Sequence, residues 1–236
     1  MEINILKSSE RGVSEHDWLS SKHSFSFANY HNPSRMNFGL LRVFNDDKVE
    51  SGMGFGMHRH DNMEIISIVL EGSLEHRDSM GNHGIIKERE VQRISAGTGI
   101  SHSESNHSKT SKAHFLQVWV EPNEMNLKPS YEQKSFLKYG KNKLNIIVSG
   151  GKNKNSLYLH QDAVFSIGVF DENKIINYMV KKPEHGVYIF IINGNVELGK
   201  NELLDGDSAE IRNTEKVEIK TKDKSAILVI EVPMTN

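Results

Sequence analysis

The sequence predicts an all-β protein built from two related antiparallel β units, each a barrel or sandwich. Two observations predict the class: apolar residues alternate along many short stretches, and Gly, Asn and Asp separate these stretches at short intervals. A third observation predicts two units, because one pattern from the first half recurs in the second. With 236 residues the chain is long enough for each unit to have its own core.

Four stretches carry the clearest strand pattern, because they are rich in Ile, Val and Phe. These expected strands are residues 63–70, 113–120, 187–192 and 226–232. Turns are expected at Glu71-Gly72 and Asn193-Gly194. Helical periodicity is scarce, and one short helix is expected around His16 to Ser21, with Ser14 as its N-cap.

Composition excludes several classes of function. The net charge is −2, so nothing global favours binding to nucleic acid or to an anionic membrane. The sequence has no cysteine, which excludes disulfides, zinc–thiolate sites, iron–sulfur clusters and cysteine nucleophiles. Residues 1–11 lack the apolar segment of a secretory signal, and no stretch reaches the roughly 18 apolar residues of a membrane span. A cytoplasmic location is expected.

Two pairs of polar residues point to a metal site. His58 and His60 form one pair, and His102 and Glu104 form the other. Side chains two positions apart on a strand share a face, so two neighbouring strands can direct three imidazoles and one carboxylate to one point. Such mixed ligands suit Fe, Ni, Cu, Mn or Zn. Glu64 is a second candidate for the carboxylate, and this pattern leaves the choice open.

The repeat predicts that one unit alone binds metal. Residues 190–197 repeat the pattern of residues 68–75, a shift of 122, and a later segment repeats with a shift near 117. The shifted positions of the four candidate ligands are Val180, Lys182, Ile219 and Thr221, which form no ligand set. We therefore expect residues 1–135 to form an N-terminal metal-binding domain and residues 136–236 a C-terminal domain that lacks metal ligands.

The segments around both pairs match a known motif. Residues 52–72 read Gly-x5-His-x-His-x3-Glu before an apolar run and a Gly turn, and residues 97–106 read Gly-x-Gly-x2-His-x3-Asn. Both resemble the two motifs of cupins, in the expected order. The remaining histidines have no matched partner, and His76, His83 and His107 are expected to be exposed near turns.

The chain resembles the pirin family, and within it the bacterial pirin-like proteins that are assigned quercetin 2,3-dioxygenase activity. The segments that carry the resemblance are residues 23–30, 41–47, 54–65, 70–82 and 95–104. The resemblance implies a bicupin, with two β-barrel or jelly-roll domains packed together. It also implies one metal ion held by His58, His60, His102 and Glu104, which favours Glu104 over Glu64 as the ligand.

The resemblance implies a function as well. The expected activity is metal-dependent cleavage of a quercetin-like flavonol with O₂, with Fe²⁺ as the expected ion and Ni, Cu, Mn, Co or Zn as alternatives. Glu104 is the natural catalytic base, because it is the carboxylate of the cluster. A metal-responsive regulator or transcription cofactor that binds a protein partner is the alternative function, and another cupin reaction is a third, because one fold hosts many activities.

Overall fold

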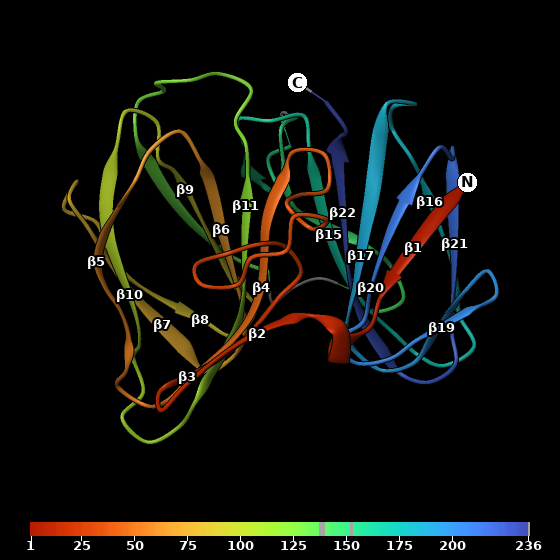
Figure 1. Ribbon diagram of the computed structural model, residues 1–236, viewed down its shortest axis with the longest axis horizontal. Coiled ribbons are helices and arrows are strands. Elements are labelled where there is room, and N and C mark those ends of the chain that lie inside the picture. Colours follow the sequence, from red (N-terminus) through yellow and green to blue (C-terminus); the bar gives the residue numbers. More distant parts are fainter. Residues whose placement is uncertain (137–139, 152, 236) are drawn as a thin grey trace.

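Each half of the chain folds into a two-layered β barrel, in which a larger sheet faces a smaller one (Figure 1). The computed structural model describes residues 1–136, 140–151 and 153–235. Within these residues the paired strands are antiparallel, except for one parallel pair near the seam. The bicupin fold expected from the sequence is therefore confirmed.

The N-terminal barrel consists of residues that follow the first strand. Its large sheet has the order β12 (Ser130–Ser135), β9 (Glu90–Ser95), β6 (Glu64–Glu71), β11 (Ala113–Val120), β4 (Leu41–Val49), β3 (Leu19–His23) and β2 (Gly12–His16). Its small sheet has the order β5 (Gly54–His60), β10 (Ile100–Asn106), β7 (Ser73–Asp78) and β8 (His83–Lys87).

The C-terminal barrel repeats this arrangement. Its large sheet has the order β1 (Glu2–Leu6), β20 (Ser208–Arg212), β17 (His185–Asn193), β22 (Ser225–Pro233), β15 (Val164–Phe170), β13 (Asn145–Ser149) and β14 (Leu157–Tyr158). Its small sheet has the order β16 (Ile175–Met179), β21 (Lys216–Thr221), β18 (Val196–Leu198) and β19 (Asn201–Leu203). The four strands expected with the clearest pattern correspond to β6, β11, β17 and β22.

The first strand joins the far half of the molecule. β1 pairs with β20, so residues 2–6 belong to the C-terminal sheet, which the sequence pattern did not predict. The short 3₁₀ helix η1 (Ser8–Glu10) then leads to the N-terminal barrel. The boundary at residues 135 and 136 stays a prediction, and residues 137–139 beside it lie outside the described residues.

The helix expected at residues 16–21 is wrong. These residues belong to a hairpin in which β2 pairs with β3. Leu19, Ser21 and His23 are buried in alternation, and β3 pairs with β4 along its length, so tertiary pairing decides the local structure. No helix within the described residues is long and apolar enough to cross a membrane.

The two large sheets pack against each other and form the main core. Phe44 on β4 lies 4.9 Å from Tyr188 and 4.8 Å from Phe190 on β17, between ring centroids. On β6, Ile66 and Ile68 join this core. Since side chains alternate along a strand, Ile65, Ser67 and Val69 face the interior of the N-terminal barrel.

The interiors of the two barrels differ in polarity. An apolar cluster fills the C-terminal one, and it includes Ile176, Val217 and Ile219. In the N-terminal one, two separate apolar clusters contain Val69 and Ile65, and polar side chains occupy the layer between them. The N-terminal barrel is therefore the one whose interior can hold a polar site.

The internal repeat is borne out by the strand order, with β9-β6-β11-β4 matching β20-β17-β22-β15. One detail of the shift is wrong. Ile219 on β21 pairs with Ile176, as His102 pairs with His58, so Ile176 rather than Val180 stands at the position of His58. The connection from β16 to β17 is longer than that from β5 to β6, and this changes the shift. Ile176 and Ile219 are both apolar and supply no metal ligand at these two positions.

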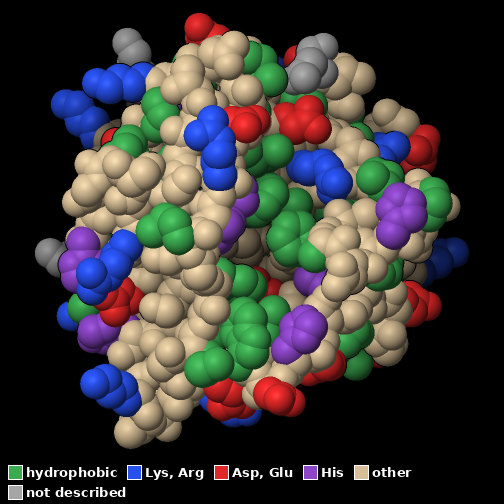
Figure 2. Space-filling model, turned by 60° about the vertical axis from the view of Figure 1, so that its left-hand side comes forward, with side chains coloured by type: hydrophobic (Ala, Val, Ile, Leu, Met, Phe, Trp, Pro, Cys, Tyr) green, Lys and Arg blue, Asp and Glu red, His purple; other side chains and the backbone are tan. Residues whose placement is uncertain are grey.

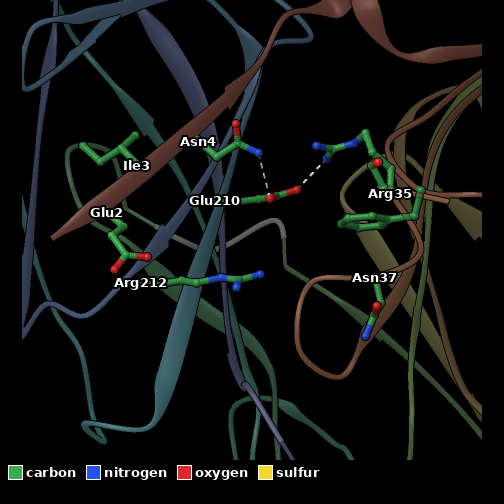
Figure 3. A pocket seen from close by; sticks show the side chains of 9 residues that line it. Glu2, Ile3, Asn4, Arg35, Asn37, Glu210 and Arg212 are labelled. Carbon is green, nitrogen blue, oxygen red and sulfur yellow. Dashed lines mark hydrogen bonds and ion pairs between the residues drawn. The ribbon is translucent and has the colours of Figure 1, made fainter. Parts of the chain in front are cut away.

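A polar cleft of about 320 Å³ lies between the two halves (Figure 3). Arg35 donates to Glu210 across it at 2.5 Å, and Asn4 on β1 donates to the same carboxylate at 3.2 Å. Both ends of the ion pair are largely buried, with side-chain exposures of 14% and 11%. This pair ties the loop before β4 to the C-terminal sheet.

We expect Glu210→Gln to lower the free energy of unfolding by about 1–3 kcal/mol, because it removes a charge-assisted hydrogen bond in a partly desolvated place. The measurement is urea unfolding. Glu218→Gln is the matched control, because Glu218 is exposed and its ion pair with Lys216 is long at 3.6 Å. Equal effects of the two substitutions would contradict this role for the cleft.

Candidate metal centre

Three neighbouring strands of the small N-terminal sheet each direct a pair of polar side chains into the barrel. β5 carries His58 and His60, β10 carries His102 and Glu104, and β7 carries His76 and Asp78. The register places His102 opposite His58 on one side and opposite Asp78 of β7 on the other. A bulge between His102 and Glu104 shifts the pairing with β5, and such bulges re-aim side chains.

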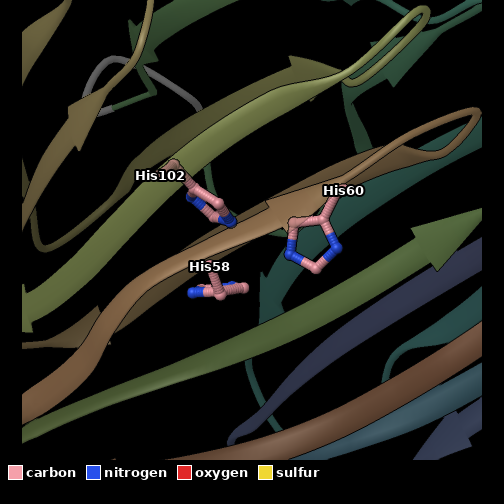
Figure 4. A group of neighbouring side chains, drawn as sticks. All are labelled: His58, His60 and His102. Atoms are coloured by element: carbon pink, nitrogen blue, oxygen red, sulfur yellow. The ribbon is translucent and has the colours of Figure 1, made fainter.

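The three histidines converge as expected from the sequence (Figure 4). Ring centroids are 4.7 Å apart for His58 and His60, 4.5 Å for His58 and His102, and 5.0 Å for His60 and His102. One nitrogen from each ring lies within 4.8 Å of the other two. Three imidazoles at this spacing suit a divalent transition metal.

The protonation of these rings also fits a metal ion. His58 Nδ1 lies 2.7 Å from the Gly56 carbonyl oxygen, so Nδ1 donates and Nε2 is the nitrogen left to face a metal. Burial lowers the pKa of His60 to about 4 and that of His102 to about 3, with the neighbouring imidazoles adding to the effect. Both rings are therefore neutral near pH 7, as metal ligation requires.

Several buried nitrogens in the cluster lack partners among the described residues, which is the strongest sign that the cluster binds a metal. His60 Nε2 and both ring nitrogens of His102 are buried and accept or donate no hydrogen bond within the described part of the chain. A buried polar atom without a partner costs free energy, and a metal ion would satisfy the nitrogens that face it. The residues present therefore fit a metal.

Glu104 lies in the polar layer of the barrel. Its carboxylate accepts from Ser67 Oγ at 2.9 Å, from Gln117 Nε2 at 2.7 Å and from Gln92 Nε2. These donors come from β6, β11 and β9, where they are direct cross-strand neighbours. Glu104 groups with His102 and His76 within 4.8 Å, and the group formed by the three convergent histidines does not include it. The side chain is thus fixed next to the cluster by the opposite sheet.

The competing carboxylate, Glu64, has different surroundings. It is buried at the start of β6, and its Oε2 accepts from the backbone N–H of His160 in the C-terminal half at 3.2 Å. Burial raises its pKa. Glu64 therefore connects the two barrels, whereas Glu104 lies beside His102.

One expectation about the other histidines is wrong. His83 and His107 are about half exposed, but His76 is fully buried on β7. It lies opposite Glu104 in the register, and its Nε2 lies 3.0 Å from Asp78 Oδ2. The spacing of His76 and Asp78 is the same i, i+2 signal that singled out the other two pairs. It could have been read from the sequence once β7 was assigned.

An aromatic cavity lies beside the histidines. Trp119 packs edge-on against His60, with centroids 4.7 Å apart, and against Phe27 at 5.3 Å. Trp119 and Phe27 also line a cavity of about 250 Å³, together with Tyr30 and Met63. Figure 2 shows a hollow on this side of the molecule with hydrophobic and histidine side chains at its walls. The site therefore combines potential metal ligands with an apolar surface.

Two family models match the chain. Residues 6–120 match Pirin, and residues 146–232 match the quercetinase C-terminal cupin domain. The chain is 39% identical over 233 residues to quercetin 2,3-dioxygenase of Escherichia coli K12, covering 98% of this chain and 99% of that protein. The chain belongs to the pirin family.

A solved structure agrees with this assignment. The bacterial pirin YhhW of Escherichia coli, in complex with nickel(II), is 38% identical, with a TM-score of 0.93 over 98% of this chain and 99% of that one. Quercetin 2,3-dioxygenase of Acinetobacter baumannii, at 18% identity and a TM-score of 0.80 over 98% of this chain and 79% of that one, shares the fold. The bicupin architecture of pirins is thus shared over nearly the whole chain.

The barrel of this pirin contains a further buried carboxyl group, Asp47 on β4. Burial raises its pKa to about 7, although Ser21 donates to it. The unfolded chain has a carboxyl pKa near 4. Between about pH 4 and pH 7 the folded state therefore binds more protons than the unfolded state. Stability from this group is present at low pH and is lost as the pH rises through this window.

We expect the change in unfolding free energy caused by Asp47→Asn in the metal-free protein to be more favourable at pH 8 than at pH 4, by on the order of 2–4 kcal/mol. The reason is that an amide cannot ionise. Urea unfolding of chelator-treated protein across this range is the measurement. Asp17→Asn serves as the control, since Asp17 is exposed. A stability difference that does not change with pH would contradict the raised pKa.

Proposed function

We propose that the protein is a metal-dependent dioxygenase that cleaves a flavonol of the quercetin type with O₂. The observation that supports this most strongly is the convergence of His58, His60 and His102 on one point, with buried nitrogens that lack partners among the described residues. The identity to a quercetin 2,3-dioxygenase over nearly all of both chains supports the substrate class.

The proposed ligands are His58, His60, His102 and Glu104. A divalent metal bound there supplies Lewis-acid chemistry to an oxygen of the substrate. Fe²⁺ is the ion we propose, with Ni, Cu, Mn, Co or Zn as alternatives. The nickel(II) complex of the Escherichia coli relative supports nickel among these alternatives. Glu104 contributes the carboxylate of this set, and it lies beside His102.

Protein residues then prepare the substrate. The cavity lined by Phe27 and Trp119 suits a flat aromatic ring, because apolar walls with few polar groups are typical of small-molecule sites. Glu104 accepts the proton of the flavonol hydroxyl, and its neutral donors on β6, β9 and β11 keep the carboxylate in place. Removal of this proton makes the ring electron-rich enough to react with O₂.

The test is quercetin-dependent O₂ uptake by protein with a measured metal content. We expect protein loaded with Fe²⁺ or Ni²⁺ to consume O₂. The O₂ uptake should stop after chelation and recover when the same ion is added back. Uptake that survives complete removal of metal would contradict the proposal. Full metal loading without uptake would also contradict it, and would leave the regulatory function as the alternative.

A further inference from the structure

The third pair, His76 and Asp78, is built as rigidly as a catalytic or ligating group. Asp78 accepts from the backbone N–H of Met80 at 2.9 Å, and from the backbone and side chain of Asn82 at 3.0 and 2.9 Å. Burial opposes ionisation of Asp78, but the hydrogen bonds from Asn82 and His76 outweigh it and lower its pKa. Asp78 is thus a fixed, charged acceptor.

The ring of His76 is fixed on two sides. Its Nε2 lies 3.0 Å from the Asp78 carboxylate, and both side chains are fully buried. Tyr131 of β12 stacks on the ring, with centroids 4.4 Å apart and planes 14° from parallel. A stack and a charge-assisted hydrogen bond leave the ring little freedom to rotate.

The hydrogen bonds determine where the proton of His76 lies. Because the Asp78 carboxylate can only accept, Nε2 is the nitrogen that carries the hydrogen of this contact. In the tautomer that this contact selects, Nδ1 has a lone pair. This Nδ1 is buried and has no partner among residues 1–136, 140–151 and 153–235. The neighbouring His102 requires a hydrogen-bond acceptor. If it binds metal through Nε2, its Nδ1 carries a hydrogen that requires an acceptor.

The two rings are close enough to satisfy each other. Their centroids are 5.6 Å apart, and one nitrogen of each lies in a group whose atoms are all within 4.8 Å of one another. A small side-chain adjustment or one bridging water spans such a gap. We propose that His76 is a positioning residue of the metal centre, which accepts from Nδ1 of His102 and so fixes the tautomer that turns Nε2 of His102 to the metal. The inference rests on the metal site of the proposed function.

The test compares His76→Leu with His76→Gln. Leucine removes the acceptor, whereas the amide oxygen of glutamine can still accept from His102. We expect Ni²⁺ affinity, measured by competition with a chelator, to fall by about 10- to 100-fold in His76→Leu, as for other residues that support a ligand. We expect His76→Gln to stay within a few-fold of the parent. The absorption spectrum of the Co²⁺ form should change in the leucine variant and return towards the parent in the glutamine variant.

Thermal unfolding of both His76 variants in the presence of chelator shows whether they fold. His83→Leu is the control, because His83 is exposed on the neighbouring strand β8 and its ring contacts Glu75. Parental affinity and spectrum in a folded His76→Leu would overturn the inference. So would two equivalents of Ni²⁺ in the parent and one in His76→Leu, because His76 would then be a ligand. If His58→Ala also leaves binding unchanged, the proposed metal site itself fails; if it abolishes binding while His76→Leu does not alter it, this inference alone fails.

Discussion

Replacing His58 with alanine is expected to abolish quercetin-dependent O₂ uptake and to leave well below one equivalent of metal per chain. The loss of affinity should exceed the roughly 10- to 100-fold that follows from loss of a residue that merely supports a ligand. His58 is half-buried at the mouth of the cluster, and its ring hydrogen-bonds the nearby Gly56 carbonyl. Its removal therefore leaves the fold intact, so activity and stability should separate.

The measurement is metal content after dialysis, together with O₂ uptake at saturating quercetin. His107→Ala is the matched control, because His107 is a half-exposed histidine that follows β10 and pairs with Glu75 rather than with the cluster. We expect the control to keep parental metal content and uptake. Parental metal content in His58→Ala would contradict the assignment of this residue as a ligand, whatever the activity.

The sequence predicted the cluster well because strand spacing alone carries the information. Residues at i and i+2 share a face in any strand, so two neighbouring strands are enough to predict that His58, His60 and His102 lie close together. The polar layer was not predictable in this way. Ser67, Gln92 and Gln117 meet Glu104 because three distant strands are in register, and register between strands is set by tertiary pairing.

The same distinction explains the fold. Buried strands such as β6 and β11 are visible from composition and alternation, and so is the repeat. The position of β1 in the C-terminal sheet is not visible from the sequence, because nothing in residues 2–6 specifies β20 as the partner strand. The hairpin of β2 and β3 does not follow from its own residues either, because β3 is fixed as a strand by its pairing with β4.

Glu104→Gln is expected to lower quercetin turnover by about 10²- to 10⁴-fold at saturating metal, the usual contribution of a general base. It should also lower the free energy of unfolding by about 1–3 kcal/mol. The carboxylate accepts from three donors, whereas an amide accepts through one oxygen and brings two hydrogens of its own into the layer. Steady-state O₂ uptake and urea unfolding measure the two effects. Glu64→Gln, which perturbs the contact with His160, should reduce stability but keep turnover.

A charge exchange separates the role of the carboxylate from its effect on folding. Gln117 lies on β11 and donates to Glu104 at 2.7 Å. Glu104→Gln combined with Gln117→Glu therefore keeps one carboxylate and one amide at this contact and exchanges their positions. We expect this double variant to regain most of the lost stability, because the hydrogen bonds can form in the opposite direction. Turnover should stay as low as in the single variant, since the carboxylate now projects from the large sheet instead of from β10 beside His102. Recovery of turnover with stability would mean that Glu104 contributes only a buried charge, and another group would have to accept the substrate proton.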